Sequence, residues 1–197
     1  TIYVKHNQMV SGDRTYMEAA GSVEFFAITS APTLQGAGDY AYTVTRNLDG
    51  TGANDWYAGD AMFNTGQVGN GFIDLYSLRG VKSASQAGPT IVGNVRNSAT
   101  YNDWSERWAL GNLNGLYGYG TTAYGFAAGV PTGTWIAADA TNGLRIMRGS
   151  TARLQADTSG SMYLNNSAGT NVITLDSSGN SYFSGVMTIG TAGEIRQ

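Results

Sequence analysis

The chain has 197 residues and carries 11 lysines and arginines against 14 aspartates and glutamates, a formal net charge of -3. We expect no nucleic-acid partner, because a phosphate backbone is bound by clustered positive charge. No apolar run reaches the roughly 20 residues that cross a bilayer, so we expect no membrane insertion. The chain has no cysteine and a single histidine, His6. We therefore expect no metal site and no cofactor.

Small polar residues dominate the composition and point to strands and turns. The chain has 28 Gly, 21 Thr, 16 Ser and 15 Asn, while only 13% of its residues are charged. Glycine destabilises helices, and Ser, Thr and Asn prefer turns, caps and strands. The hydrophobic fraction of 42% is too high for a disordered linker. The composition predicts an all-β fold.

The texture of the sequence predicts two regions. Residues 1–138 are irregular, and we expect an irregular β-sandwich or jelly-roll-like domain there. Residues 139–197 are regular, and we expect a repetitive β shaft segment. In the first region the predicted strands are Ser22–Ile28, Tyr40–Thr45, Gly71–Tyr76 and Thr90–Val95. Residues 15–20 and 102–110 are predicted as short helices.

An acidic loop and an aromatic pair lie early in the chain. The loop 49–55 offers oxygen ligands, but it lacks the alternating carboxylates of an EF-hand, so an Asp-Gly turn is favoured over a calcium site. Trp56 and Tyr57 follow, flanked by Asp55 and Asp60. These rings are candidates for stacking on a sugar ring. The open alternative is that Trp56 is a plug under a loop.

The segment 102–110 supplies a second set of candidates for contact with a glycan. Trp104 and Trp108 are four residues apart and would share one face of the predicted helix. Asp103 and Glu106 would lie on one side of it. Carboxylate pairs can hydrolyse glycosides, and Asp55 with Asp60 is the other close pair. Arg107 beside Asp103 and Glu106 favours ordinary ion pairing. We therefore assign no catalytic residues and expect a protein that is not an enzyme.

A third aromatic set is interleaved with glycine in residues 111–129. Tyr117, Tyr119 and Tyr124 stand among glycines that leave room around each ring. They are candidates for contact with a glycan. The favoured alternative is that these aromatics pack in a core or at an interface between chains.

The last region repeats a turn signature. Asp139, Asp157 and Asp176 each begin a turn that ends in glycine, and they are spaced 18 and 19 residues apart. Short apolar strands lie between the turns, at 144–147, 162–164, 172–175 and 186–189. A unit of about 19 residues with two short strands cannot bury its own apolar side chains. Sister copies of the chain are expected to cover them.

This last stretch resembles a known family. Residues 164–190 contain a Leu-Asp-Ser-Ser-Gly-Asn turn and a Phe-Ser-Gly-Val-Met-Thr-Ile-Gly strand. Both resemble the repeats of bacteriophage tail fibres and tailspikes, and residues 45–60 and 69–77 also resemble segments of phage tail proteins. The resemblance implies an intertwined homotrimer in the virion tail, outside the cell. Its implied partners are other tail or baseplate proteins and a host cell-surface polysaccharide.

Two other functions stay open at this point. One is a depolymerising tailspike that cleaves the surface polysaccharide as a glycosidase. The other is a bacterial extracellular adhesin or filament subunit, which would be built from the same kind of short β repeats. The expected mechanism of the leading hypothesis is multivalent adhesion, in which weak sites on several chains reinforce one another.

Overall fold

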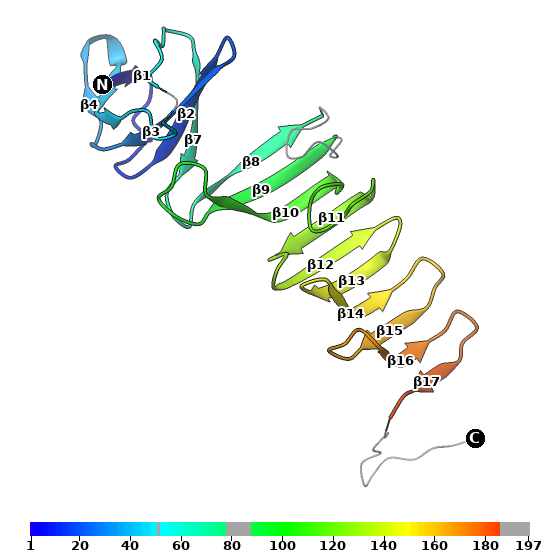
Figure 1. The fold of residues 1–197 in the computed structure, drawn as a ribbon. Coiled ribbons are helices and arrows are strands. Elements are labelled where there is room, and N and C mark those ends of the chain that lie inside the picture. Colours follow the sequence, from blue (N-terminus) through cyan, green and yellow to red (C-terminus); the bar gives the residue numbers. More distant parts are fainter. Residues whose placement is uncertain (51, 78–87, 186–197) are drawn as a thin grey trace. The chain divides into compact units, whose positions relative to one another are not determined.

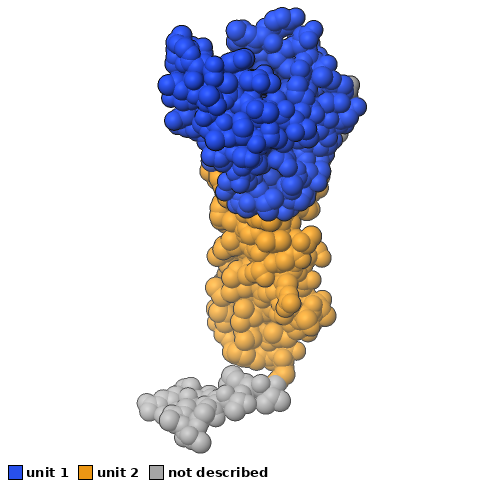
Figure 2. Space-filling view, turned by 90° about the vertical axis from the view of Figure 1, so that its left-hand side faces the viewer, with its two compact units in different colours: residues 1–74, 93–106 blue, residues 75–92, 107–197 orange. Residues whose placement is uncertain are grey.

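The computed structural model describes residues 1–50, 52–77 and 88–185. It confirms the all-β class, with 50% of the residues in strands and 2% in helix. The helix within the described residues is one 3-10 turn, η1 (Gly36–Gly38). In this part of the chain there is no apolar helix of membrane-spanning length. The chain divides into two compact units, residues 1–74 with 93–106 and residues 75–92 with 107–197 (Figure 2).

The first unit contains two small antiparallel sheets, seen near the N-terminus in Figure 1. The three-stranded sheet has the order β1-β5-β4, with β1 (Ile2–Val4), β5 (Tyr40–Tyr42) and β4 (Thr33–Leu34). The four-stranded sheet has the order β6-β3-β2-β7, with β6 (Val44–Thr45), β3 (Ser22–Ile28), β2 (Arg14–Ala19) and β7 (Ala61–Gly66). Met9, Ile28 and Tyr42 form the centre of an apolar core to which both sheets contribute.

The predicted helix at residues 15–20 is wrong, because this segment is strand β2. It pairs with β3 through a two-residue turn, in which Ala20 and Gly21 have φ angles of 49° and 83°. Positive φ at both central residues is the geometry of a type I′ hairpin turn. Ala-Gly is a less recognisable form of this turn than Asn-Gly, so the sequence signal was weak. The pairing of β2 with β3 and β7 then overrides local helix propensity.

The remaining strands form one sheet of ten in sequential order, β8 to β17 (Figure 1). Each of the strands from β10 onward pairs antiparallel with the next. Their bounds are β8 (Gly71–Tyr76), β9 (Thr90–Arg96), β10 (Trp104–Asn112), β11 (Tyr124–Gly129), β12 (Thr134–Asp139), β13 (Gly143–Arg148), β14 (Thr151–Ala156), β15 (Met162–Asn165), β16 (Asn171–Leu175) and β17 (Ser181–Phe183).

The predicted helix at residues 102–110 is also wrong, because most of this segment lies in β10. Its residues pair with β11 from Trp108↔Ala128 to Asn112↔Tyr124. Tryptophan is common in strands, and a partner strand on each side satisfies the backbone of β10. The i, i+4 spacing of the two tryptophans is even, so it suits one face of a strand as well as one face of a helix.

The predicted turns lie where the sequence placed them. Asp139, Asp157 and Asp176 each accept hydrogen bonds through Oδ1 from backbone N–H groups two to four residues later, at 2.8 to 2.9 Å, 2.9 Å, and 2.8 to 3.0 Å. The glycines that close these turns, Gly143, Gly160 and Gly179, all have positive φ. A further turn, which the sequence analysis did not include, has Asn166 in the place of the aspartate.

One face of the sheet in the second unit is covered by the chain itself. Val92, Ala109, Ala127, Trp135, Ala137 and Met147 meet Leu113, Leu116 and Tyr117 of the segment after β10 in one apolar cluster. This face becomes polar farther along, where the register aligns Arg145, Gln155, Tyr163, Thr174 and Tyr182. Among the described residues, the covered core of this unit therefore lies on β9 to β13 and the segment after β10.

The opposite face of the same strands carries two uninterrupted rows, which we call the apolar face. Side chains directly opposite one another on neighbouring strands lie on the same face of a sheet. The first row is Leu110, Phe126, Ala138, Leu144, Ala156, Met162, Leu175 and Ser181, and the second is Trp108, Ala128, Ile136, Ile146, Leu154, Leu164, Ile173 and Phe183. Neither row contains a charged residue, and most of its large side chains are exposed.

The expected boundary between residues 138 and 139 falls at the end of β12, inside the second compact unit. The predicted strand at 186–189 lies outside the described residues. The predicted strands at 144–147, 162–164 and 172–175 are confirmed as β13, β15 and β16.

Candidate functional site

The seven candidate aromatic residues lie in different surroundings. Tyr117 is buried, with 7% of its surface exposed, and its ring lies 5.3 Å from that of Trp135. Its hydroxyl donates a hydrogen bond to the carbonyl of Gly129 at 3.1 Å. This placement matches the alternative in which the residue packs in a core, and it leaves Tyr117 no open ring face for a sugar.

Tyr119 belongs to a buried polar cluster in the second unit. Its hydroxyl donates to Oδ2 of Asp139 at 2.5 Å and accepts from the Arg145 guanidinium at 2.7 Å. Arg145 also pairs with Asp139 at 3.2 Å. Burial, reinforced by the hydrogen bond to Asp139, raises the pKa of Tyr119 to about 12. The cluster ties the segment after β10 to β12 and β13, so it explains Tyr119 as a structural residue.

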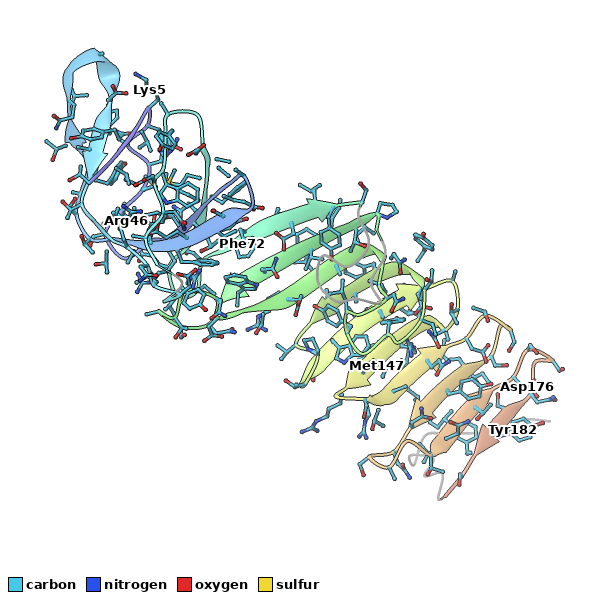
Figure 3. All side chains as sticks on the ribbon, turned by 45° about the horizontal axis from the view of Figure 1, so that its top comes forward. Lys5, Arg46, Phe72, Met147, Asp176 and Tyr182 are labelled. Atoms are coloured by element: carbon cyan, nitrogen blue, oxygen red, sulfur yellow. The ribbon has the colours of Figure 1, made fainter. Side chains whose placement is uncertain are left out.

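A cleft of about 500 Å³ opens beside this cluster. Its lining includes Tyr117, Tyr119, Trp135, Arg145 and Met147, the last of which is labelled in Figure 3. Trp135 is only 5% exposed, and its Nε1 is bonded to the carbonyl of Gly149 at 2.9 Å. The tyrosine hydroxyls, the indole N–H and the guanidinium that line this cleft therefore already form hydrogen bonds within the chain.

Trp108 and Tyr124 lie on the apolar face or beside it. Trp108 is a half-buried member of the second row, and Tyr124 is 52% exposed opposite Asn112. Trp108 pairs with the apolar Ala128 of the same row, whereas Tyr124 pairs with the polar Asn112 beside the rows. Trp108 therefore suits a contact between chains, and Tyr124 lies at the margin of that surface.

Trp104 is held within the first unit by a buried cation. Its ring meets that of Phe72 edge-on at 5.3 Å, and the Arg96 guanidinium lies 5.6 Å from its centroid. Arg96 is 1% exposed and donates hydrogen bonds to the carbonyls of Thr100 and Tyr101. Trp104 covers this buried guanidinium and has a structural role.

Trp56 and Tyr57 lie together in a second cleft, within the first unit. The cleft has a volume of about 540 Å³, and Asp55, Asp60 and Arg46 also line it. The structure therefore brings together the four residues that the sequence analysis grouped here. Tyr57 is 72% exposed, whereas Trp56 is half-buried and meets Phe26 edge-on at 6.5 Å.

Glu24, which the sequence analysis did not single out, organises this cleft. Its carboxylate is fully buried and accepts hydrogen bonds from Arg46 Nε at 3.0 Å and from Trp56 Nε1 at 2.7 Å. It also accepts from the backbone N–H groups of Asn47 at 3.1 Å and Asn54 at 2.8 Å. One carboxylate thus fixes both ends of the loop 47–54 and the ring of Trp56.

The protonation of Glu24 follows from these bonds. Burial alone acts to raise its pKa, but the hydrogen bonds from Arg46, Asn54 and Trp56 outweigh it and lower the pKa to about 2. A signal for this residue was present in the sequence. Glu24 alternates with Phe26 and Ile28, so an acidic side chain points to the core side of a predicted strand.

Asp103 and Glu106 do not lie on one face of a helix, as the sequence analysis expected. Asp103 bonds to the side chain of Asn97 at 3.0 Å, and Glu106 lies within strand β10. Residues three apart on extended backbone point to opposite sides, so the shared side predicted for a helix is lost. His6 is exposed and its Nδ1 accepts from the Gln8 N–H at 3.4 Å.

The described part of the loop 49–55 is tied by hydrogen bonds rather than arranged around a cation. The N–H of Gly52 donates to Asn47 Oδ1 at 2.7 Å. Over residues 1–50, 52–77 and 88–185, no three acidic or histidine side chains gather as a metal site.

Comparisons of the chain with protein-family models, with curated proteins and with solved structures find no match. Function is therefore inferred from the residues and their geometry.

Proposed function

We propose that the chain is a structural and adhesive segment of a phage tail, a trimeric fibre or spike that contributes to attachment at the host surface through glycans. In this proposal the strands from β10 onward are part of a β shaft and the first unit is a sandwich-like domain. The observation that carries the proposal is the apolar face. The resemblance of residues 164–190 to tail-fibre repeats supports it independently.

The apolar face is too extensive to remain in water. Its two rows cross eight strands, about 34 Å at the usual spacing between strands. Exposed members include Leu110 (51%), Phe126 (39%) and Leu175 (42%). A continuous apolar surface of this kind marks an interface in a soluble protein.

Copies of the same chain are the partner that best fits this face. The rows are about 7 Å apart, so the face is narrow and long. It is uncharged from end to end, and a partner must therefore be equally apolar along the same length. Three such sheets around one axis present only matching narrow faces to each other. Burial also permits two copies, and the tail-fibre resemblance selects three.

The mass of the native assembly tests this proposal. At micromolar concentration we expect three chains by sedimentation equilibrium or native mass spectrometry. Leu164→Lys places a charge in the apolar face and is expected to yield a smaller species. Tyr163→Lys changes the neighbouring residue on the opposite face and is expected to keep three chains.

A well-folded single chain at micromolar concentration would overturn the proposal, and a stable dimer would contradict the trimer. Loss of assembly in Tyr163→Lys but not in Leu164→Lys would show that the chains meet through the face that carries Tyr163 and not through the apolar face.

A further inference from the structure

The cleft around Trp56 has the dimensions and lining of a ligand site. Its volume of about 540 Å³ lies within the roughly 300 to 1,000 Å³ usual for ligand pockets. Apolar side chains of Met17, Phe26 and Met62 contribute to it from three strands of one sheet. Exposed polar and aromatic groups, Asp55 and Tyr57, line the same cleft.

The groups that line the cleft are held in place by hydrogen bonds, and those to Glu24 are partly buried. Glu24 fixes the indole of Trp56 and the guanidinium of Arg46, which Figure 3 labels on the first unit. Asp60 Oδ2 accepts from the Tyr57 N–H at 2.7 Å, and the Asp60 N–H donates to the Tyr57 carbonyl at 3.1 Å. A site that is ordered before binding loses less entropy when it captures a ligand.

The charge of the cleft selects among ligands. Arg46 is the cationic side chain in its lining, and it is already paired with Glu24 at 2.6 Å. Asp55 and Asp60 contribute two carboxylates to the same lining. Carboxylates accept hydrogen bonds from hydroxyl groups and repel other carboxylates. The balance of charge therefore favours a ligand that carries hydroxyls and disfavours one that carries acidic groups.

We infer that this cleft binds a neutral saccharide unit, with the ring of Tyr57 or Trp56 against the C–H face of the sugar and with Asp55 and Asp60 accepting from its hydroxyls. The inference rests on the proposed function for its biological setting and deepens it by naming the site and the class of glycan. An aromatic ring contributes apolar contact area without needing a charge on the ligand.

Binding of the assembled protein to immobilised polysaccharides tests the inference. The neutral probes are glucan, mannan and galactan, and polygalacturonate is the acidic counterpart. We expect at least one neutral polymer to retain the protein and polygalacturonate not to retain it. The same incubations are expected to release no new reducing ends, as the non-enzymatic proposal requires.

Two variants locate the binding. Tyr57→Ala removes an exposed ring and Asp55→Ala removes an exposed carboxylate, so neither disturbs a buried contact. Each is expected to weaken binding by about tenfold, the equivalent of roughly 1.4 kcal/mol. Tyr182→Ala is the control, because Tyr182 is also highly exposed, at 58%, but belongs to the second unit.

Three outcomes would overturn the inference: no neutral polymer retains the protein, polygalacturonate retains it instead, or Tyr57→Ala and Asp55→Ala both bind as well as Tyr182→Ala. The mass of the assembly is measured on the same samples. Three chains without saccharide binding would reject the site and leave the fibre proposal standing. Saccharide binding by a single chain would support the site and reject the fibre proposal.

Discussion

At the scale of single residues, buried carboxylates organise both units. Glu24 accepts from the side chains of Arg46 and Trp56 and from the backbone of the loop 47–54. Asp139 accepts from Tyr119, Arg145 and its own turn. A buried charge is tolerated only where partners compensate its loss of hydration. Each of these residues therefore fixes segments that are distant from it in the sequence.

Replacement of Glu24 by glutamine should destabilise the first unit by roughly 3 kcal/mol at neutral pH, because the Arg46 guanidinium loses its buried partner. The measurement is denaturant unfolding followed by tryptophan fluorescence. Glu18→Gln is the matched control on the adjacent strand, where Glu18 is exposed. Equal stability of Glu24→Gln and the parent chain would contradict the role given to Glu24.

The same residue predicts a dependence on pH. A carboxyl whose pKa is lowered by folding, here from 4.5 to about 2, stabilises the fold above pH 4.5 and loses that contribution as the pH falls toward 2. The corresponding free energy is about 3 kcal/mol. Glu24→Gln should lack this part of the acid sensitivity, whereas Glu18→Gln should retain it.

At the scale of elements, the turns decide where the strands of the second unit begin and end. Each aspartate bonds to the backbone of its own turn, and each closing glycine adopts a positive φ. These interactions are local. The same hydrogen bonds therefore form wherever the same turn residues recur, here at intervals of 18 and 19 residues.

Two glycines of these turns differ in the space around them. A Cβ on Gly143 would lie 2.1 Å from the carbonyl oxygen of Ala156, whereas a Cβ on Gly179 would meet nothing within 4 Å. Both have similar φ, 76° and 87°. Gly179→Ala should therefore cost only the strain of the left-handed conformation, about 1 kcal/mol.

Gly143→Ala should cost at least twice as much, because the clash with Ala156 is added to the same strain. Thermal unfolding of the two variants compares them directly. Equal losses of stability would show that the backbone conformation of the turn, and not the contact with Ala156, sets the cost of a side chain at residue 143.

At the scale of the whole molecule, the second unit buries one part of its sheet and leaves the apolar face open. Strand alternation places Ile173 on this face and Thr174 on the opposite one. The parent chain has no cysteine, so a single introduced thiol is a clean probe of contacts between chains.

Ile173→Cys is expected to form disulfides between chains on mild oxidation, because in the proposed trimer equivalent residues near the three-fold axis approach one another closely enough to bond. Two of the three chains would be linked and the third left single on a non-reducing gel. Thr174→Cys is expected to remain uncrosslinked. The opposite pattern would show that the polar face, rather than the apolar one, lies between the chains.

Much of the fold could be predicted from local signals, and much of the site could not. Ser22–Ile28 and Gly71–Tyr76 are strands with the predicted bounds, because β-branched and aromatic residues there lie between turn formers. Residues 15–19 and 104–110 carry similar residue types, but their strands depend on distant partners. Local propensity gave no information about those partners.

The amino-acid sequence by itself determined the all-β class, the aspartate turns and the excess of apolar strand residues, since each depends on neighbours within a few positions. Only the tertiary structure decided that Glu24 holds Trp56 beside Asp55 and Asp60, and that the register lines up two apolar rows from Trp108 to Phe183. Those features depend on pairings between residues far apart in the chain. A shift of one residue in register would turn the same side chains to the other face.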